Sequence, residues 1–129
     1  MDKNKKILII EDDANLLYGM QAKLSLEGFR IIADEGSGRT EIIGKIKFFK
    51  PDYIILDIVL PEDNGFDILA GIKSDPETKK IPVFIFTDLS DSESKQKGRE
   101  FGADFYLIKS ELNIDGLVEK FKSIIKNLK

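Results

Sequence analysis

The chain has 129 residues, of which 42% are hydrophobic, and this length suits one compact domain with its own core. It contains neither cysteine nor histidine, which excludes disulfide bonds, thiol catalysis, zinc sites built on those residues and histidine-assisted nucleophiles. A net charge of −3 gives no general attraction to nucleic acid or to an anionic membrane. No stretch resembles a signal peptide or a membrane span, so we predict a soluble cytoplasmic protein.

Apolar runs alternate with helical periodicities along the chain. Short runs of aliphatic, β-branched or aromatic residues predict buried strands at residues 7–10, 30–33, 53–56, 81–86 and 105–108. Apolar residues at helical spacing predict helices within residues 16–24, 42–49, 66–72 and 117–128, whereas residues 91–100 are so polar that a helix there would bury little. We therefore predict an α/β domain, a doubly wound five-stranded parallel sheet with helices on both faces.

Local signals mark the ends of several of these elements. Asp13 is a suitable N-cap for the first helix, and Gly28 is a suitable stop. The second helix must end before Pro51, and the third before Pro76. Three acids follow the first strand, where a dinucleotide-binding or P-loop protein would have its glycines. Nucleotide binding by those devices is therefore disfavoured.

Four of the five predicted strands end in a side chain that can take part in chemistry. Glu11 and Asp12 follow the first strand, Asp57 the third, Thr87 the fourth and Lys109 the fifth. Each of them, taken alone, is more often a turn, cap or surface residue than a site residue. The carboxyl ends of parallel strands meet at one edge of the sheet, however, so we expect these groups to converge there.

The expected cluster has a composition that suits phosphoryl transfer. Three neighbouring carboxylates repel one another unless a cation lies between them, and hard oxygen ligands suit Mg²⁺. We interpret Asp57 as the nucleophile because its strand is the most deeply buried by pattern. Glu11 and Asp12 would hold the metal, Lys109 would pair with one phosphoryl oxygen, and Thr87 would donate a hydrogen bond to another.

Four motifs together resemble the receiver domain of two-component response regulators, in order and in spacing. They are Ile7-Leu8-Ile9-Ile10-Glu11-Asp12-Asp13, residues 52–61 with Gly65, Ile81-Pro82-Val83 leading to Thr87, and Gly102-Ala103-Asp104 leading to Tyr106 and Lys109. The resemblance implies a flavodoxin-like fold with strand order 2-1-3-4-5. It covers essentially the whole chain, so we expect residues 1–129 to form a single receiver domain without an output domain.

This resemblance also implies a function. Asp57 would accept a phosphoryl group from the phosphohistidine of a sensor histidine kinase or from a phosphotransfer protein. The backbone carbonyl of Val59 would join Glu11, Asp12 and Asp57 on Mg²⁺. Such a domain is a phospho-accepting signalling module and not an ordinary enzyme, although it assists its own phosphorylation and dephosphorylation.

Two residues are implied to act as the switch, and the signal is implied to leave by protein contact. Thr87 would move toward the phosphoryl group, and Tyr106 would turn inward. An aromatic simply packed on its strand remains the alternative reading of Tyr106. We expect a downstream protein target, bound through the polar fourth helix, the fifth strand and the last helix. We expect no direct contact with nucleic acid or membrane, and a homodimer remains an option.

Two other functions stay open, and three positions depart from the usual family sequence. The chain could be an interaction module that signals without phosphate, whereas an aspartate-nucleophile phosphatase is disfavoured because Val59 stands where a second acid is usual. Ser110 replaces a proline that usually has a cis bond, so we predict a trans bond there. Asp88 adds negative charge near an anion-accepting site. The pair Asp63-Asn64 has no assigned role.

Overall fold

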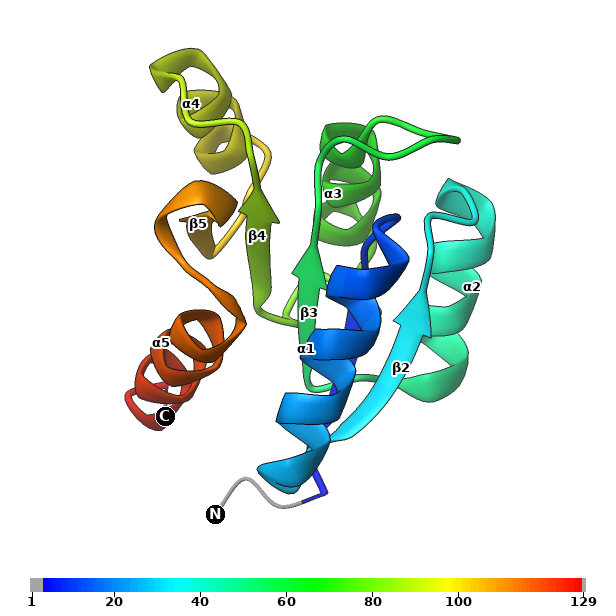
Figure 1. Ribbon diagram of the computed structural model, residues 1–129. Coiled ribbons are helices and arrows are strands. Elements are labelled where there is room, and N and C mark those ends of the chain that lie inside the picture. The colour runs from blue at the N-terminus through cyan, green and yellow to red at the C-terminus, as the bar shows by residue number, and fades with distance from the viewer. Residues whose placement is uncertain (1–3, 129) are drawn as a thin grey trace.

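Five parallel strands form one sheet in the order β2-β1-β3-β4-β5 in the computed structural model, which describes residues 4–128 (Figure 1). The order confirms the predicted flavodoxin-like topology. Residues 1–3 and 129 of the predicted domain lie outside the described residues. The strands are β1 (Lys6–Ile10), β2 (Arg30–Asp34), β3 (Tyr53–Leu56), β4 (Val83–Thr87) and β5 (Phe105–Ile108).

A helix follows each strand, as the alternating pattern predicted, and the helices cover both faces of the sheet (Figure 1). Helices α1 and α5 pack on one face, and α2, α3 and α4 lie on the other. A short 3₁₀ turn, η1 (Lys109–Glu111), links β5 to the last helix. The helices are α1 (Ala14–Leu26), α2 (Arg39–Phe49), α3 (Gly65–Ser74), α4 (Ser92–Glu100) and α5 (Ile114–Lys126).

Successive residues of the strands feed two separate hydrophobic cores, because side chains alternate across a sheet. Ile7 and Ile9 join the core under α1 and α5, whereas Leu8 and Ile10 join the core under α2 and α3. All four are buried, so the unbroken aliphatic run of β1 is explained by a sheet that is covered on both faces. The strand ends where these buried aliphatic residues give way to the charged Glu11.

Side-chain caps set the start of most helices. The carboxylate of Asp13 accepts a hydrogen bond from the backbone amide of Leu16, with 3.2 Å between Oδ1 and the amide nitrogen, which confirms the predicted N-cap role of Asp13. Asn64 caps α3 in the same way, with 2.7 Å between its side-chain oxygen and the amide of Phe66. Helix α1 ends just before Gly28, whose φ of 100° lies in the left-handed region that glycine tolerates best.

Strand β4 begins two residues later than predicted. Ile81 is part of the preceding turn, because its amide donates to the Thr78 carbonyl at 3.1 Å and its own carbonyl accepts the Lys73 ammonium at 2.8 Å. Pro82 has no amide hydrogen to give to a strand, and regular pairing starts at Val83. The apolar run alone did not reveal that its first two residues close a turn.

The polar segment 91–100 does form a helix, and it buries as little as its composition predicted. Of the residues of α4, Gly98 alone is buried.

No peptide bond between residues 4 and 128 is cis, so the predicted trans bond before Ser110 is confirmed. Among these residues, no helix is both long and apolar enough to cross a membrane.

Candidate functional site

The parallel register of β1 and β3 brings two acids to the same edge of the sheet. Ile10 pairs with Leu56, and the amide of Asp57 donates to the Ile10 carbonyl at 3.0 Å. Glu11 and Asp57 therefore stand directly after neighbouring strands. Their exposed fractions are only 1% and 4%, so two carboxylates lie buried beside each other.

Lys109 reaches both of these carboxylates from the start of η1. Its Nζ lies 2.8 Å from Oδ2 of Asp57 and 2.9 Å from Oε1 of Glu11. The two contacts span 52 and 98 residues of sequence, so they exist only because β5, β3 and β1 end at the same edge. One ammonium thus balances part of the negative charge of the site.

Burial and hydrogen bonds together shift the pKa values of Glu11 and Lys109. Burial raises the pKa of Glu11 to about 7, and the nearby charge of Asp57 acts in the same direction, against hydrogen bonds from Lys109 and from the amide of Asp13. Burial alone would lower the pKa of Lys109, but its hydrogen bonds to Asp57 and Glu11 outweigh this and raise it. The lysine therefore stays charged, whereas burial disfavours the ionised form of Glu11.

Asp12 adds a third carboxylate on the solvent side. One oxygen each from Glu11, Asp12 and Asp57 lies within 4.8 Å of the others, which is close enough for a single ion to bind all three. All three donors are hard oxygens, and the exposed Asp12 leaves the group open to water. This donor set fits Mg²⁺, which prefers a few carboxylates and keeps several of its waters.

Backbone amides orient the Asp57 side chain. Its Oδ1 accepts the amide of Ile58 at 2.6 Å and that of Val59 at 3.3 Å, while Oδ2 faces Lys109. The Val59 side chain is 58% exposed, so it marks the outer rim of the site. Each oxygen of Asp57 thus has its own partners, and the carboxylate is held in one orientation.

Thr87 and Tyr106 meet at a third residue, Leu89, which lies in the loop after β4. The Tyr106 hydroxyl donates to the Leu89 carbonyl at 2.7 Å, and the Leu89 amide lies 3.5 Å from the Thr87 hydroxyl oxygen. Thr87 is fully buried, and this amide, not Asp57, is its side-chain hydrogen-bond partner within residues 4–128. The site therefore gathers Glu11, Asp12, Asp57 and Lys109 directly, whereas the side-chain hydrogen bonds of Thr87 and Tyr106 go to Leu89.

The ring of Tyr106 lies against Gly98 of α4. A methyl group at Gly98 would lie 3.0 Å from Cδ2 of Tyr106 and 3.2 Å from Cδ1 of Ile85, which is tighter than ordinary van der Waals contact. The missing side chain thus lets the tyrosine lie between α4 and the sheet. Burial raises the pKa of Tyr106, and the charges of Asp91 and Asp57 add to this effect.

We expect Gly98→Ala to push the Tyr106 ring toward solvent. The new methyl group competes for the space of the ring, so the hydroxyl should leave the Leu89 carbonyl and its pKa should fall toward the ordinary value. A pH titration of the ring resonances by NMR measures this. Gly44→Ala in α2 is the matched control, since nothing lies within 4 Å of a methyl group there. An unchanged Tyr106 pKa in Gly98→Ala would contradict the expectation.

The loop before α3 contains residues to which the sequence assigned no role. Asn64 caps α3, and a polar residue directly before a helical pattern is a local signal that could have revealed this. Asp63 accepts the amide of Arg39 at 2.6 Å, across 24 residues of sequence. No local pattern could have predicted that second contact.

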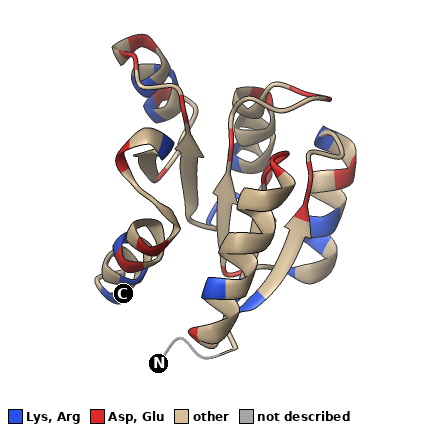
Figure 2. Ribbon diagram, in the orientation of Figure 1, with Lys and Arg blue, Asp and Glu red and all other residues tan. Residues whose placement is uncertain are grey.

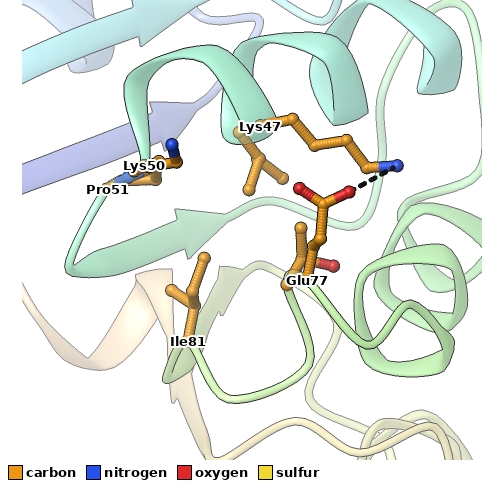
Figure 3. Close-up of a pocket in the computed structure, with 7 residues that line it drawn as sticks. Lys47, Lys50, Pro51, Glu77 and Ile81 are labelled. Atoms are coloured by element: carbon orange, nitrogen blue, oxygen red, sulfur yellow. Dashed lines mark ion pairs between the residues drawn. The ribbon is translucent and has the colours of Figure 1, made fainter.

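Acidic side chains gather around the site, and the described cavity lies elsewhere. Figure 2 shows acidic segments in the loops that follow β1, β2 and β3, above the sheet in that view. A cavity of about 190 Å³ lies near the start of β3, whereas Asp57 follows the other end of that strand. Figure 3 shows side chains that line this cavity. No predicted site residue lines it; its lining residues are Ile46, Lys47, Lys50, Pro51, Glu77, Thr78 and Ile81.

Comparisons with known proteins agree on one family. A family model described as the response regulator receiver domain matches residues 7–122. Protein PilH of Pseudomonas aeruginosa is 34% identical over 104 residues, which cover 81% of this chain and 84% of PilH. A solved CheY-like response regulator receiver domain protein from Methanospirillum hungatei matches with a TM-score of 0.84 at 25% identity, covering 96% of this chain and 95% of that one.

Other relatives are longer than this chain. The phosphate regulon transcriptional regulatory protein PhoB of Pseudomonas aeruginosa is 30% identical over 122 residues, which cover 95% of this chain and 52% of PhoB. The chain thus spans about half the length of PhoB. The likeness to PhoB concerns this shared portion.

Proposed function

This chain belongs to the response regulator receiver family, and from that premise we propose that it accepts a phosphoryl group on Asp57 and passes on a signal by protein contact. The observation that carries the proposal is the ion pair of Lys109 with both Glu11 and Asp57. It supports a site in which the acceptor carboxylate of Asp57 and the metal ligand Glu11 both lie within hydrogen-bonding distance of Lys109. The Lys109 ammonium could then bind an incoming phosphoryl group.

Asp57 is the acceptor in this proposal. One of its carboxylate oxygens attacks the phosphorus of a phosphohistidine on a sensor histidine kinase or phosphotransfer protein. The new O–P bond forms as the P–N bond breaks, and the donor imidazole leaves with the electron pair. The hydrogen bonds from Ile58 and Val59 hold the carboxylate in one orientation while the donor approaches.

The acidic group would hold Mg²⁺ through Glu11, Asp12, Asp57 and the backbone carbonyl of Val59. When bound, the ion neutralises charge on the transferring phosphoryl group and on the acids around it. The raised pKa of Glu11 supports this assignment, because a bound cation would offset the burial that disfavours the ionised form of this carboxyl.

Lys109 and Thr87 complete the proposed site. The Lys109 ammonium would exchange part of its contact with Asp57 for one phosphoryl oxygen. The Thr87 hydroxyl would move to donate a hydrogen bond to another phosphoryl oxygen. This movement would change its contact with the Leu89 amide, and the Leu89 carbonyl accepts a hydrogen bond from Tyr106. Thr87 and Tyr106 thereby form the proposed switch.

We further propose that the domain acts in the cytoplasm as a signalling module, and that it assists its own phosphorylation and dephosphorylation. Its partners would be a histidine kinase or phosphotransfer protein and a downstream protein target. The given sequence has no histidine, so a phosphohistidine donor would lie outside these 129 residues. The exposed polar surface of α4 is a suitable place for the target to bind.

Acetyl phosphate tests this function directly. Incubation with acetyl phosphate and Mg²⁺ should raise the intact mass by one phosphoryl group, and a chelator should prevent the increase. Peptide mapping should locate the group on Asp57. A mass increase that persists under chelation would contradict the magnesium requirement.

A receiver-like interaction module that needs no phosphate is the second candidate. It predicts no mass increase with acetyl phosphate or with a histidine-phosphorylated donor protein. The buried, ion-paired Asp57 and Lys109 favour the first candidate, because a module without phosphoryl chemistry gains nothing from two crowded acids.

A further inference from the structure

Asp63 caps a helix that belongs to a different part of the chain. Its Oδ2 accepts the amide of Arg39, the first residue of α2, at 2.6 Å. The N-cap residue of α2 itself is Gly38, which has no side chain to accept a hydrogen bond. A carboxylate at a helix N-terminus also interacts favourably with the helix dipole. The half-buried Asp63 thus replaces the cap that α2 lacks.

The loop that precedes α2 is shaped to receive this contact. Gly36 and Gly38 have φ of 96° and 111°, in the left-handed region. A methyl group on Gly36 would lie 2.9 Å from Cδ of Pro61, and one on Gly38 would lie 3.5 Å from Oδ2 of Asp63. The loop after β3 therefore rests directly on the backbone of the loop after β2.

The receiving loop is itself firmly held. Asp34 at the end of β2 is 2% exposed, and its Oδ1 accepts the amides of Gly36 and Ser37 at 2.7 and 2.8 Å. Its Oδ2 accepts the Ser37 hydroxyl at 2.6 Å and pairs with the Lys45 ammonium at 2.9 Å. The buried acid ties the loop both to the sheet and to α2, so Asp63 binds to a fixed partner.

The loop that Asp63 anchors is the one that carries the site. It runs from Asp57 to Asn64 and includes Val59, whose amide donates to Asp57. At its far end the amide of Gly65 returns to the Ile58 carbonyl at 2.8 Å. Between these points, Asn64 caps the adjoining α3, and Asp63 makes the side-chain hydrogen bond that joins the loop to α2, an element 24 residues earlier in the chain.

We propose that Asp63 is a positioning residue, which holds the Val59 backbone in place by fixing its loop to the N-terminus of α2. The inference rests on the proposed function where it concerns Mg²⁺, because the Val59 carbonyl is the proposed ligand. Loss of the cap lets the loop move away from α2 and takes the carbonyl out of place. Asp63 itself does not touch the acceptor or the ion.

Three variants separate this role from simple electrostatic attraction of a cation. Asp63→Ala removes both the cap and one negative charge. Asp63→Asn removes the charge but keeps an oxygen that caps about as well. Glu62→Gln is the matched control, since it removes the same charge from the adjacent exposed residue and leaves Asp63 intact.

Two measurements on the unphosphorylated full chain report the result. In the magnesium-free protein, Asp63→Ala should speed amide hydrogen exchange at Arg39 and Val59 about fivefold, whereas Asp63→Asn and Glu62→Gln should leave both nearly unchanged. In a calorimetric Mg²⁺ titration, Asp63→Ala should raise Kd about fivefold beyond the increase seen in Glu62→Gln, and Asp63→Asn should match Glu62→Gln.

The outcomes decide the proposal separately from the proposed function. Faster exchange at Arg39 without a change at Val59 would show a cap that does not position the site, and would overturn the proposal. An equal Mg²⁺ effect in Asp63→Ala and Glu62→Gln would overturn it as well. If the parent chain bound no Mg²⁺, the metal role in the proposed function would fail, whereas faster exchange at Val59 would still support positioning.

Discussion

Replacing Asp57 with asparagine is expected to abolish phosphoryl uptake from acetyl phosphate while the fold persists. The asparagine side chain has nearly the same shape as aspartate and can still accept a hydrogen bond from the backbone amide of Ile58. It lacks the anionic oxygen that would attack phosphorus. Lys109 keeps Glu11 as its partner, so no buried cation is left unpaired. Intact mass spectrometry measures uptake, and circular dichroism confirms that the variant folds.

The exposed Asp67 in α3 offers the matched control for this prediction. Asp67→Asn makes the same chemical change outside the site and should take up the phosphoryl group at the parent rate. Uptake that persists in Asp57→Asn would mean that another residue is the acceptor. A loss in both variants would point to an indirect effect of charge.

Asp57→Asn should also change how the stability of the chain depends on pH. The folded chain holds a proton on Glu11 up to a pKa of about 7, above the ordinary value of 4.5, so this group lowers the stability as the pH rises through that window. Asparagine at position 57 removes one cause of the raised pKa. In chelator, Asp57→Asn should therefore lose less stability than the parent chain between about pH 5 and pH 8, as urea denaturation would measure.

Gly65→Ala is expected to lower the free energy of unfolding by about 3 kcal/mol, at the upper end of typical overpacking costs. A methyl group at Gly65 would overlap Cα of Ile58 and would lie 2.7 Å from the carbonyl oxygen of Asp57. These are backbone atoms, which cannot rotate away as a side chain could. The loop that carries Asp57, the proposed acceptor, must shift, so phosphoryl uptake should fall as well.

Gly44→Ala is a direct control for Gly65→Ala. Gly44 lies within α2, and nothing is within 4 Å of the position that a methyl group would take. There the usual helix preference for alanine should dominate and raise stability by about 0.5–1 kcal/mol. Opposite shifts of the urea midpoint in the two variants would support the prediction. A Gly65→Ala protein as stable as the parent chain would refute it.

The sequence predicted the sheet well because its strands are short apolar runs bounded by charged or turn residues. β1 and β3 end where Glu11 and Asp57 interrupt the aliphatic pattern, and a parallel sheet then requires these ends to meet. The predicted start of β4 was wrong because the backbone of Ile81 hydrogen-bonds to a turn and to Lys73. The composition of the apolar run does not reveal these two contacts. Periodicity identifies what is buried, whereas the exact strand limits depend on tertiary partners.

The candidate site divides in the same way. Acids and a lysine at strand ends are visible in the sequence, because the topology alone brings them together. The contacts around them are not visible: Asp63 reaches a helix that precedes it in the chain, and Gly98 matters through the ring of Tyr106. In both cases the partner is distant in sequence and carries no pattern that identifies it. Such contacts emerge only from the packed structure.

The sparse burial of α4 has an energetic consequence. The hydrophobic contribution to holding a helix in place scales with the apolar area it removes from water, at roughly 25 cal/mol per Å². Gly98 contributes little such area, and the other attachments of α4 include the Lys97 ammonium, 4.9 Å from the centre of the Phe66 ring. Burial of apolar area therefore contributes little to holding α4 against the sheet.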